Sequence, residues 1–476
     1  MNKKDYLLWG AICAGISILC GILLLYSSNL AFLIDRPLYV YAMALYVISG
    51  ACVYIIVYRV KFLVPSLFLF VFFAILPFLG AMNADQYFNN IAEYYGRGRP
   101  NFEFPTFLFS IGTVSFFGGV LIGWYFPGKP KRQYIALWKI KRLQMFLTIS
   151  LLLAGAGTLL AFYKIGYVPL FKHASSEERV AYAYTIGSFA LRFSHHWLVP
   201  GMIAVLLYLI GERKRRYIYL AVGILSGMGT LFYAQRTGLV WFLSAFWLMY
   251  YKIARPNLRR IIAAGCLASI LIYGMMLESE YRSGMYAQEG ENRILKHSFF
   301  EWSQYSIVVN EVRVSGKYLG WEILVGPFLT FIPGQIFELV GADKGELMKD
   351  YSAVFYYGKQ FEEPYGIRIT PIGEGYAAIG IYGVIFNMVI LGIFFGFLER
   401  RYWEYDIRDG RVFVVCYGIA LMTHLPITSI YVIIVPMTVT GIFIIGYYLL
   451  GTQKFKSHYG ISIEMNLKNK INKNTI

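Results

Sequence analysis

Long apolar runs alternate along this chain with short charged segments, and one long polar interval interrupts the alternation. The runs have about the 20 residues that an α-helix needs to cross roughly 30 Å of hydrocarbon. Helices are expected because in lipid only helices and closed barrels satisfy their own backbone groups. The pattern predicts an all-α polytopic membrane protein with about twelve transmembrane helices, at 6–27, 37–57, 62–81, 105–126, 143–163, 197–211, 217–234, 238–251, 261–277, 376–398, 412–430 and 432–450.

Two polar intervals predict where the chain stands outside the membrane. With the N-terminus and the C-terminus in the cytoplasm, the large interval 278–375 and the smaller interval 165–196 both face outward, and 451–476 forms a basic cytoplasmic tail. A thirteenth span at the apolar stretch 318–341 would move that tail outside, against the charge rule. We therefore expect a re-entrant or interface-lying pair of short helices there, within a single membrane domain, 1–476.

Composition agrees with this topology. The chain is 58% hydrophobic and only 15% charged, far from the quarter or so of charged residues that a soluble domain carries. Its net charge of +17 comes mainly from Lys and Arg in the predicted inner segments, as the positive-inside rule requires. The charge therefore indicates membrane topology and anionic lipid, and no nucleic-acid partner is expected.

The sequence offers no pattern typical of a metal or disulfide site. All five cysteines fall inside predicted spans, so no disulfide is expected in the outer intervals. The six histidines show no metal-ligand spacing, and the neighbours His195 and His196 would point about 100° apart on a helix. We expect neither a metal nor a cofactor.

Arginines in the outer segments are the candidate binding residues. Arg236 lies in a five-residue connection between two spans, at the outer boundary, where topology does not call for a cation. Snorkelling to lipid headgroups remains an alternative for it. Guanidinium groups match phosphate oxygens in a bidentate way, so the set predicts an anionic substrate. The other candidate arginines in the outer segments are Arg179, Arg192, Arg282, Arg293, Arg313 and Arg368.

Three places could supply a general base. Glu374 precedes the span 376–398 and could accept a proton from a sugar hydroxyl, although a helix-start acid favoured by the dipole is an equally simple explanation. His424 and the pair His195 and His196 lie at the outer ends of spans, where they could act as bases or simply pack.

Four short motifs, in this order, resemble the oligosaccharide repeat-unit polymerases, the Wzy-type family that includes the O-antigen polymerases. They are GYVPLF at 166–171 followed by Arg179, the QRTG turn with Arg236, FIPG at 331–334, and ITPIGEGYAAIGIYG at 369–383. The resemblance covers most of the chain from about 140 to 450.

The resemblance implies a GT-C-like, metal-independent glycosyltransferase in the bacterial plasma (inner) membrane. Such an enzyme moves a growing glycan from a polyprenyl diphosphate, such as undecaprenyl diphosphate, to the non-reducing end of a new lipid-linked repeat unit on the outer face. Arg179 and Arg236 would contact the diphosphate, Arg192, Arg282 and Arg368 would be further contacts, and Glu374 or His424 would be the base. A chain-length regulator and a flippase would be partners.

Three other functions remain open. An O-antigen-ligase-like transferase, which delivers the glycan to a different acceptor, would share the fold and the arginines. A flippase for the same lipid-linked oligosaccharide is disfavoured, because transporters place charged contacts near the midplane and these predicted spans contain almost no ionisable residues. A non-catalytic scaffold is the third.

Overall fold

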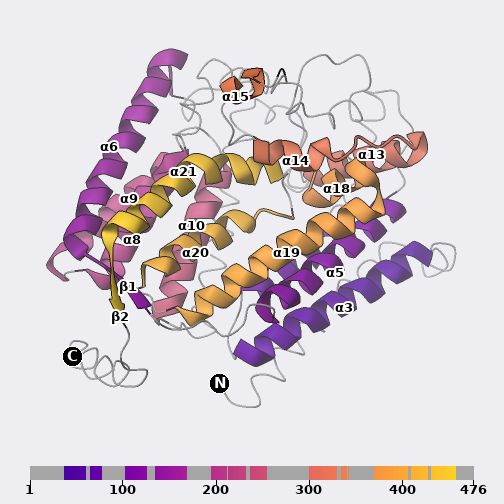
Figure 1. The fold of residues 1–476 in the computed structure, drawn as a ribbon, viewed down its shortest axis with the longest axis horizontal. Coiled ribbons are helices and arrows are strands. Elements are labelled where there is room, and N and C mark those ends of the chain that lie inside the picture. The colour runs from indigo at the N-terminus through magenta and orange to yellow at the C-terminus, as the bar shows by residue number, and fades with distance from the viewer. Residues whose placement is uncertain are drawn as a thin grey trace, which may run out of the picture.

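The computed structural model describes residues 37–60, 65–74, 76–77, 102–125, 134–168, 195–211, 213–231, 236–254, 300–329, 334–339, 341, 369–405, 409–426 and 430–456. These residues are almost entirely helical (Figure 1). The helices are α3 (Pro37–Val60), α5 (Glu103–Tyr125), α6 (Ile140–Ile165), α8 (Leu198–Ile210), α9 (Arg216–Leu231), α10 (Arg236–Ala254), α13 (Phe300–Ser315), α14 (Glu322–Leu329), α15 (Gly334–Leu339), α18 (Pro371–Ile379), α19 (Ile381–Glu404), α20 (Gly410–Met422) and α21 (Ile430–Gly451). Two 3-10 turns, η1 (His195–Trp197) and η2 (Arg213–Arg215), precede α8 and α9.

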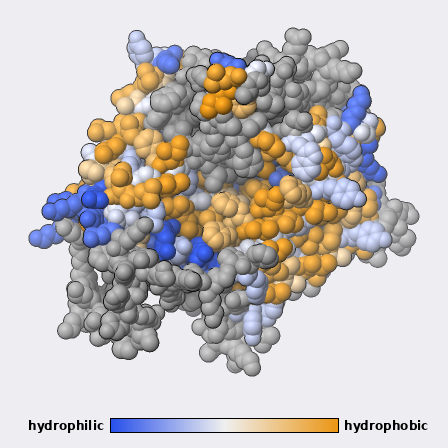
Figure 2. All heavy atoms as spheres, in the orientation of Figure 1, coloured by the Kyte–Doolittle hydropathy of each residue, from blue (hydrophilic) through white to orange (hydrophobic). Residues whose placement is uncertain are grey.

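Four of these helices are long and apolar enough to cross a membrane, and they lie at Leu38–Tyr58, Glu103–Tyr125, Ile140–Ile165 and Ile381–Glu404. Shorter apolar helices accompany them, among them Pro65–Ala74. Apolar side chains cover much of the described surface between α3 and α6 (Figure 2). A multi-pass helical membrane protein is thus confirmed. The predicted spans 6–27 and 261–277 lie outside the described residues.

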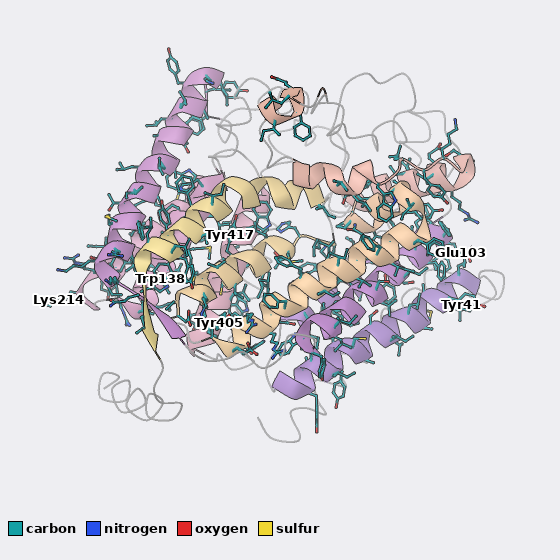
Figure 3. The ribbon with its side chains drawn as sticks, viewed as in Figure 1. Tyr41, Glu103, Trp138, Lys214, Tyr405 and Tyr417 are labelled. Atoms are coloured by element: carbon teal, nitrogen blue, oxygen red, sulfur yellow. The ribbon has the colours of Figure 1, made fainter. Side chains whose placement is uncertain are left out.

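The helix bundle has two ends, which Figure 3 marks with labelled side chains. The backbone N–H of Leu38 donates to Glu103 Oε1 over 3.2 Å, so α3 and α5 begin at the same end. Tyr41 and Glu103 lie at this end, and Trp138, Lys214 and Tyr405 lie toward the opposite side of the molecule (Figure 3). We name these the Glu103 end and the Tyr405 end. The predicted topology makes the Glu103 end the outer one.

Helices α5 and α19 run parallel and pack through glycines on both sides. Gly119 and Gly123 stand four residues apart on α5, and Gly392 and Gly396 stand four residues apart on α19. A Cβ added at Gly119 would lie 2.4 Å from the carbonyl oxygen of Val389, and the other three glycines are as close to backbone of the facing helix. Two facing small-xxx-small motifs therefore bring the two backbones into contact.

A buried carboxylate joins three helices near the Tyr405 end. Glu399 of α19 has no exposed surface, and its two oxygens accept hydrogen bonds from Ser66 N at 2.7 Å and from Trp124 Nε1 at 2.9 Å. Arg400 Nη1 donates to the carbonyl of Trp124 at 2.9 Å, which adds a second link between α5 and α19. These bonds hold the start of helix Pro65–Ala74, the end of α5 and the end of α19 together.

Two short strands close the Tyr405 end, so the all-α prediction is incomplete there. Strand β1 (Tyr134–Trp138) pairs antiparallel with β2 (Thr452–Lys456), placing Trp138 opposite Thr452. The indole of Trp138 is buried against Gly451 and Gly410, where an added Cβ would meet its ring at 2.7 Å and 3.3 Å respectively. The pairing joins the segment before α6 to the segment after α21, a contact without a local sequence signal.

Within the large interval, the apolar stretch 318–341 contains two short helices, α14 and α15, as predicted. Their position at the bilayer surface stays a prediction. The predicted span 376–398 needs correction, because the chain ends α18 at Ile379 and starts α19 at Ile381. Gly380 between them has φ +72°, a conformation that L-residues with a side chain rarely adopt. Hydropathy is continuous across this break, so the run of apolar residues concealed it.

Candidate functional site

Helix α18 packs antiparallel to the first part of α19, so that the first turn of α18 lies inside the bundle. The Thr370 side chain caps the helix by accepting from Gly373 N at 3.4 Å, and Pro371 occupies the first helical turn, where its missing N–H costs nothing. Asn387 Nδ2, more than a turn into α19, donates to the carbonyl of Pro371 at 2.8 Å. The start of α18 is therefore packed among α5, α13 and α19 and lies below the turn at Gly380.

Glu374 lies in this buried first turn. Its side chain is 5% exposed, and Oε2 accepts a hydrogen bond from Ile430 N, the first residue of α21, at 3.1 Å. Two helix N-termini, those of α18 and α21, thus meet at one carboxylate. Glu374 is thus an acid in the first turn of a helix, and its carboxylate also connects two helices that are distant in sequence.

His424 lies just after the end of α20 and is 6% exposed. Its ring packs edge-to-face with Trp241 of α10, with centroids 5.6 Å apart at 73°. The hydroxyls of Thr423 and Ser244 lie 3.5 Å apart beside this pair. Trp241 was not among the predicted site residues, although its place five residues after Arg236 in one helix is visible in the sequence.

Arg236 is the first residue of α10, and the structure describes its backbone. Five residues separate it from Trp241, which is about 7.5 Å along a helix axis. The Tyr402 hydroxyl donates to the carbonyl of Leu248, so the later part of α10 lies near the Tyr405 end. The helix therefore runs from the Glu103 end toward the Tyr405 end, and Arg236 lies closer to the Glu103 end than Trp241 does. The arginine thus begins the helix that contacts His424.

The structure therefore brings three predicted site residues to one region. Glu374 is bonded to the first residue of α21, His424 lies in the turn that follows α20, and Arg236 starts the helix whose Trp241 packs on His424. Arg236 and His424 lie toward the Glu103 end of their elements, whereas Glu374 lies in the first turn of α18, deeper in the bundle than the turn at Gly380. Arg179, Arg192, Arg282 and Arg368 lie outside the described residues, so their placement stays a prediction.

His196 has a packing role. It lies in η1 with no exposed surface, and its ring meets Phe443 of α21 at 4.6 Å and 69°. Burial lowers the pKa of His196 to about 4, so the imidazole is neutral at physiological pH. Next to it, Trp197 Nε1 donates to Thr158 Oγ1 at 2.9 Å and joins η1 to α6. These contacts agree with the packing alternative for this residue.

Among the described residues, no group of three or more His, Cys, Asp or Glu side chains could hold a metal ion. The candidate region instead offers one carboxylate, one imidazole and an arginine position at the start of a helix. That set suits proton transfer and the binding of an anionic group.

Comparison with known proteins gives one match. The family model described as "Putative O-antigen polymerase" matches residues 59–310, which include α5, α6, α8, α9 and α10 with Arg236. Glu374 and His424 lie beyond the matched range. None of the curated proteins and none of the solved structures matches the chain. Since the family match extends over more than half of the 476 residues, the chain belongs to the O-antigen polymerase family.

Proposed function

We propose that this protein polymerises lipid-linked oligosaccharide repeat units at the outer face of the bacterial plasma membrane. The observation that carries the proposal is the family match over 59–310, which includes Arg236. The donor is a glycan on a polyprenyl diphosphate, and the acceptor is the non-reducing end of a new repeat unit on its own lipid carrier. The Glu103 end of the bundle faces outward in this proposal.

The reaction breaks the bond between the anomeric carbon and the diphosphate oxygen and forms a bond from that carbon to an acceptor hydroxyl oxygen. The acceptor proton passes to a base, and the bonding electrons leave with the diphosphate. Negative charge therefore grows on the leaving group, where fixed guanidinium groups stabilise it most. Arg236 and Arg179 fill this role, with Arg192, Arg282 and Arg368 as further contacts, and no metal ion is required.

The two candidate bases differ in their surroundings. Glu374 already accepts a hydrogen bond from Ile430 N, so this carboxylate takes part in holding the start of α21. His424 packs on an aromatic neighbour, Trp241, and imidazole is the side chain that acts most often as a general base. We therefore assign proton acceptance to His424 first and a positioning role to Glu374, with Glu374 as the alternative base.

Reconstitution tests the proposal directly. Wild-type protein in lipid nanodiscs receives a lipid-linked repeat unit as the sole substrate, and the products are separated by length. A ladder of longer glycans is expected. Arg236→Ala should lose the ladder, whereas Arg216→Ala should keep it, because Arg216 is also the first residue of a helix but belongs to the opposite end. No ladder from the wild type, or an undiminished ladder from Arg236→Ala, refutes the mechanism.

The same assay separates the bases and the rival functions. His424→Gln should reduce the rate by about 100-fold or more if the imidazole accepts the proton. Glu374→Gln keeps an oxygen for Ile430 N, so a comparable loss there would transfer the base role to Glu374. Ligase-like and flippase functions predict no ladder. In cells, a deletion strain should accumulate single repeat units on the carrier, whereas loss of a ligase would accumulate long lipid-linked chains.

A further inference from the structure

A group of aromatic rings with one arginine stands at the Glu103 end, on the side of α18 away from Glu374. Its members come from three segments: Phe104 from the start of α5, Tyr376 from α18, and Arg313 and Tyr318 from the end of α13 and the linker after it. We name these four residues the Arg313 cluster. None of them has a role in the transfer step described above.

The cluster is built by ring contacts in series. The guanidinium carbon of Arg313 lies 4.5 Å from the centroid of the Phe104 ring, within the range of a cation–π interaction. Phe104 meets Tyr376 edge-to-face at 5.5 Å, and Tyr376 meets Tyr318 in the same manner at 6.2 Å. The rings therefore form a continuous row from α5 across α18 to the linker.

The linker is held in place by its backbone. Leu319 N and Gly320 N donate to the carbonyls of Ala377 and Ala378 near the end of α18, at 2.8 Å and 3.0 Å. The Tyr318 ring lies over the turn between α18 and α19, where a Cβ added at Gly380 would be 3.1 Å from its hydroxyl oxygen. The position of Tyr318 is thus fixed by the fold, while 53% of its side chain stays exposed.

This exposed stretch faces water and not hydrocarbon. All six residues from Arg313 to Tyr318 are exposed, and two of them, Arg313 and Lys317, carry positive charge. From 316 to 320 the backbone is not helical, and irregular backbone does not face the hydrocarbon of a bilayer. Lipid contact therefore does not account for the exposed face of Tyr318. Trp321 differs, because it packs on Phe386 of the candidate span α19.

A pyranose ring is the ligand whose chemistry suits such a surface. One face of a sugar presents C–H bonds with partial positive charge, which pack on the negative face of an aromatic ring, while its hydroxyls bond to a tyrosine hydroxyl or a guanidinium. Tyr376 is two residues after Glu374, so the two side chains leave α18 about 200° apart. The Glu374 side chain and the cluster therefore lie on opposite sides of a single helix, α18.

We propose that the Arg313 cluster is a glycan-binding site that holds sugars of the saccharide chain while its end is at the Glu374 region. This inference rests on the proposed function for the identity of the saccharide. Tyr318 supplies the stacking face, Arg313 binds sugar hydroxyls, and Phe104 and Tyr376 fix both in place.

Binding of a carrier-free saccharide tests the site apart from catalysis. The probe is a set of oligosaccharides of a few repeat units, cut from the polysaccharide of the source cell and carrying neither lipid nor diphosphate. Calorimetry measures their affinity for full-length protein in nanodiscs. Tyr318→Ala should weaken binding about tenfold and Tyr318→Phe much less, because the ring supplies the stacking face. Arg313→Gln should weaken binding as well.

The matched control is Tyr382→Ala, since Tyr382 is an 81% exposed tyrosine in the first turn of α19 outside the cluster. It should bind the probe as the wild type does. Thermal unfolding of each variant verifies the fold, and the exposed Arg313→Gln serves if Tyr318→Ala unfolds. The proposed glycan-binding site is refuted if wild-type protein builds a ladder but does not bind the probe. It is also refuted if Tyr318→Ala binds the probe with unchanged affinity. Wild-type protein that binds the probe but builds no ladder overturns the proposed function instead.

Discussion

Two adjacent glycines of α5 allow a direct test of the contact between α5 and α19. An alanine Cβ at Gly119 would lie 2.4 Å from the carbonyl oxygen of Val389 and 3.0 Å from Ile393 N, whereas a Cβ at Gly118 would meet nothing within 4 Å. Ordinary van der Waals contact begins near 3.4 Å, so Gly119→Ala requires the backbones to separate by about 1 Å. Overpacking of this kind costs about 1–3 kcal/mol.

The neighbour serves as the internal reference. Replacing a helical glycine by alanine adds about 0.5–1 kcal/mol of helix stability at either position, so this contribution cancels in the comparison. Gly119→Ala should therefore be less stable than Gly118→Ala by about 1–3 kcal/mol. Chemical unfolding in mixed micelles, followed by tryptophan fluorescence, measures the difference. Equal stability of the two variants would show that the helices are not in backbone contact there.

Three further predictions concern other parts of the bundle. Gly380→Ala should destabilise the protein by about 1–3 kcal/mol, because φ +72° with ψ −151° is open essentially to glycine alone, and thermal unfolding should show a lower midpoint. Glu399→Ala leaves the buried donors of Ser66 and Trp124 without their acceptor and should lower the free energy of unfolding by about 1–3 kcal/mol for each donor. Glu399→Gln should lower it less, because one oxygen remains, and urea unfolding compares the two variants. The folded-state pKa of His196, about 4, lies below the ordinary value of 6.5. The stability that its neutral form contributes is therefore complete above pH 6.5 and falls by up to about 3 kcal/mol as the pH decreases toward 4. Unfolding midpoints of the wild type should decline over this window more steeply than those of His196→Gln.

Hydropathy predicted the long helices well, because membrane-spanning segments follow from local composition. The spans at 37–57, 105–126 and 143–163 correspond closely to α3, α5 and α6. The short helices predicted at 318–341 are present as well, as α14 and α15. The break at Gly380 was missed, since a glycine between apolar residues resembles many glycines that do not interrupt a helix.

The candidate site depended on contacts that no local pattern contains. Glu374 and His424 were chosen separately, and the structure shows that Glu374 is bonded to Ile430 at the start of α21 and that His424 lies in the turn after α20. The acceptor role of Glu374 toward α21 and the packing of Trp241 on His424 arise from tertiary packing between helices distant in sequence. Arg313 illustrates the same limit, because its surroundings became informative only when Phe104 and Tyr376 were brought beside it.

The pairing of β1 with β2 has a consequence for how the protein is made. Tyr134 is synthesised early, but its partner Lys456 leaves the ribosome only after α21. Strand β1 therefore lacks its partner β2 while the later helices enter the bilayer. Because chains fold from the N-terminus as they emerge and long loops close slowly, this pairing belongs to the last steps of assembly. The two strands can pair only after the helices between them have entered the bilayer.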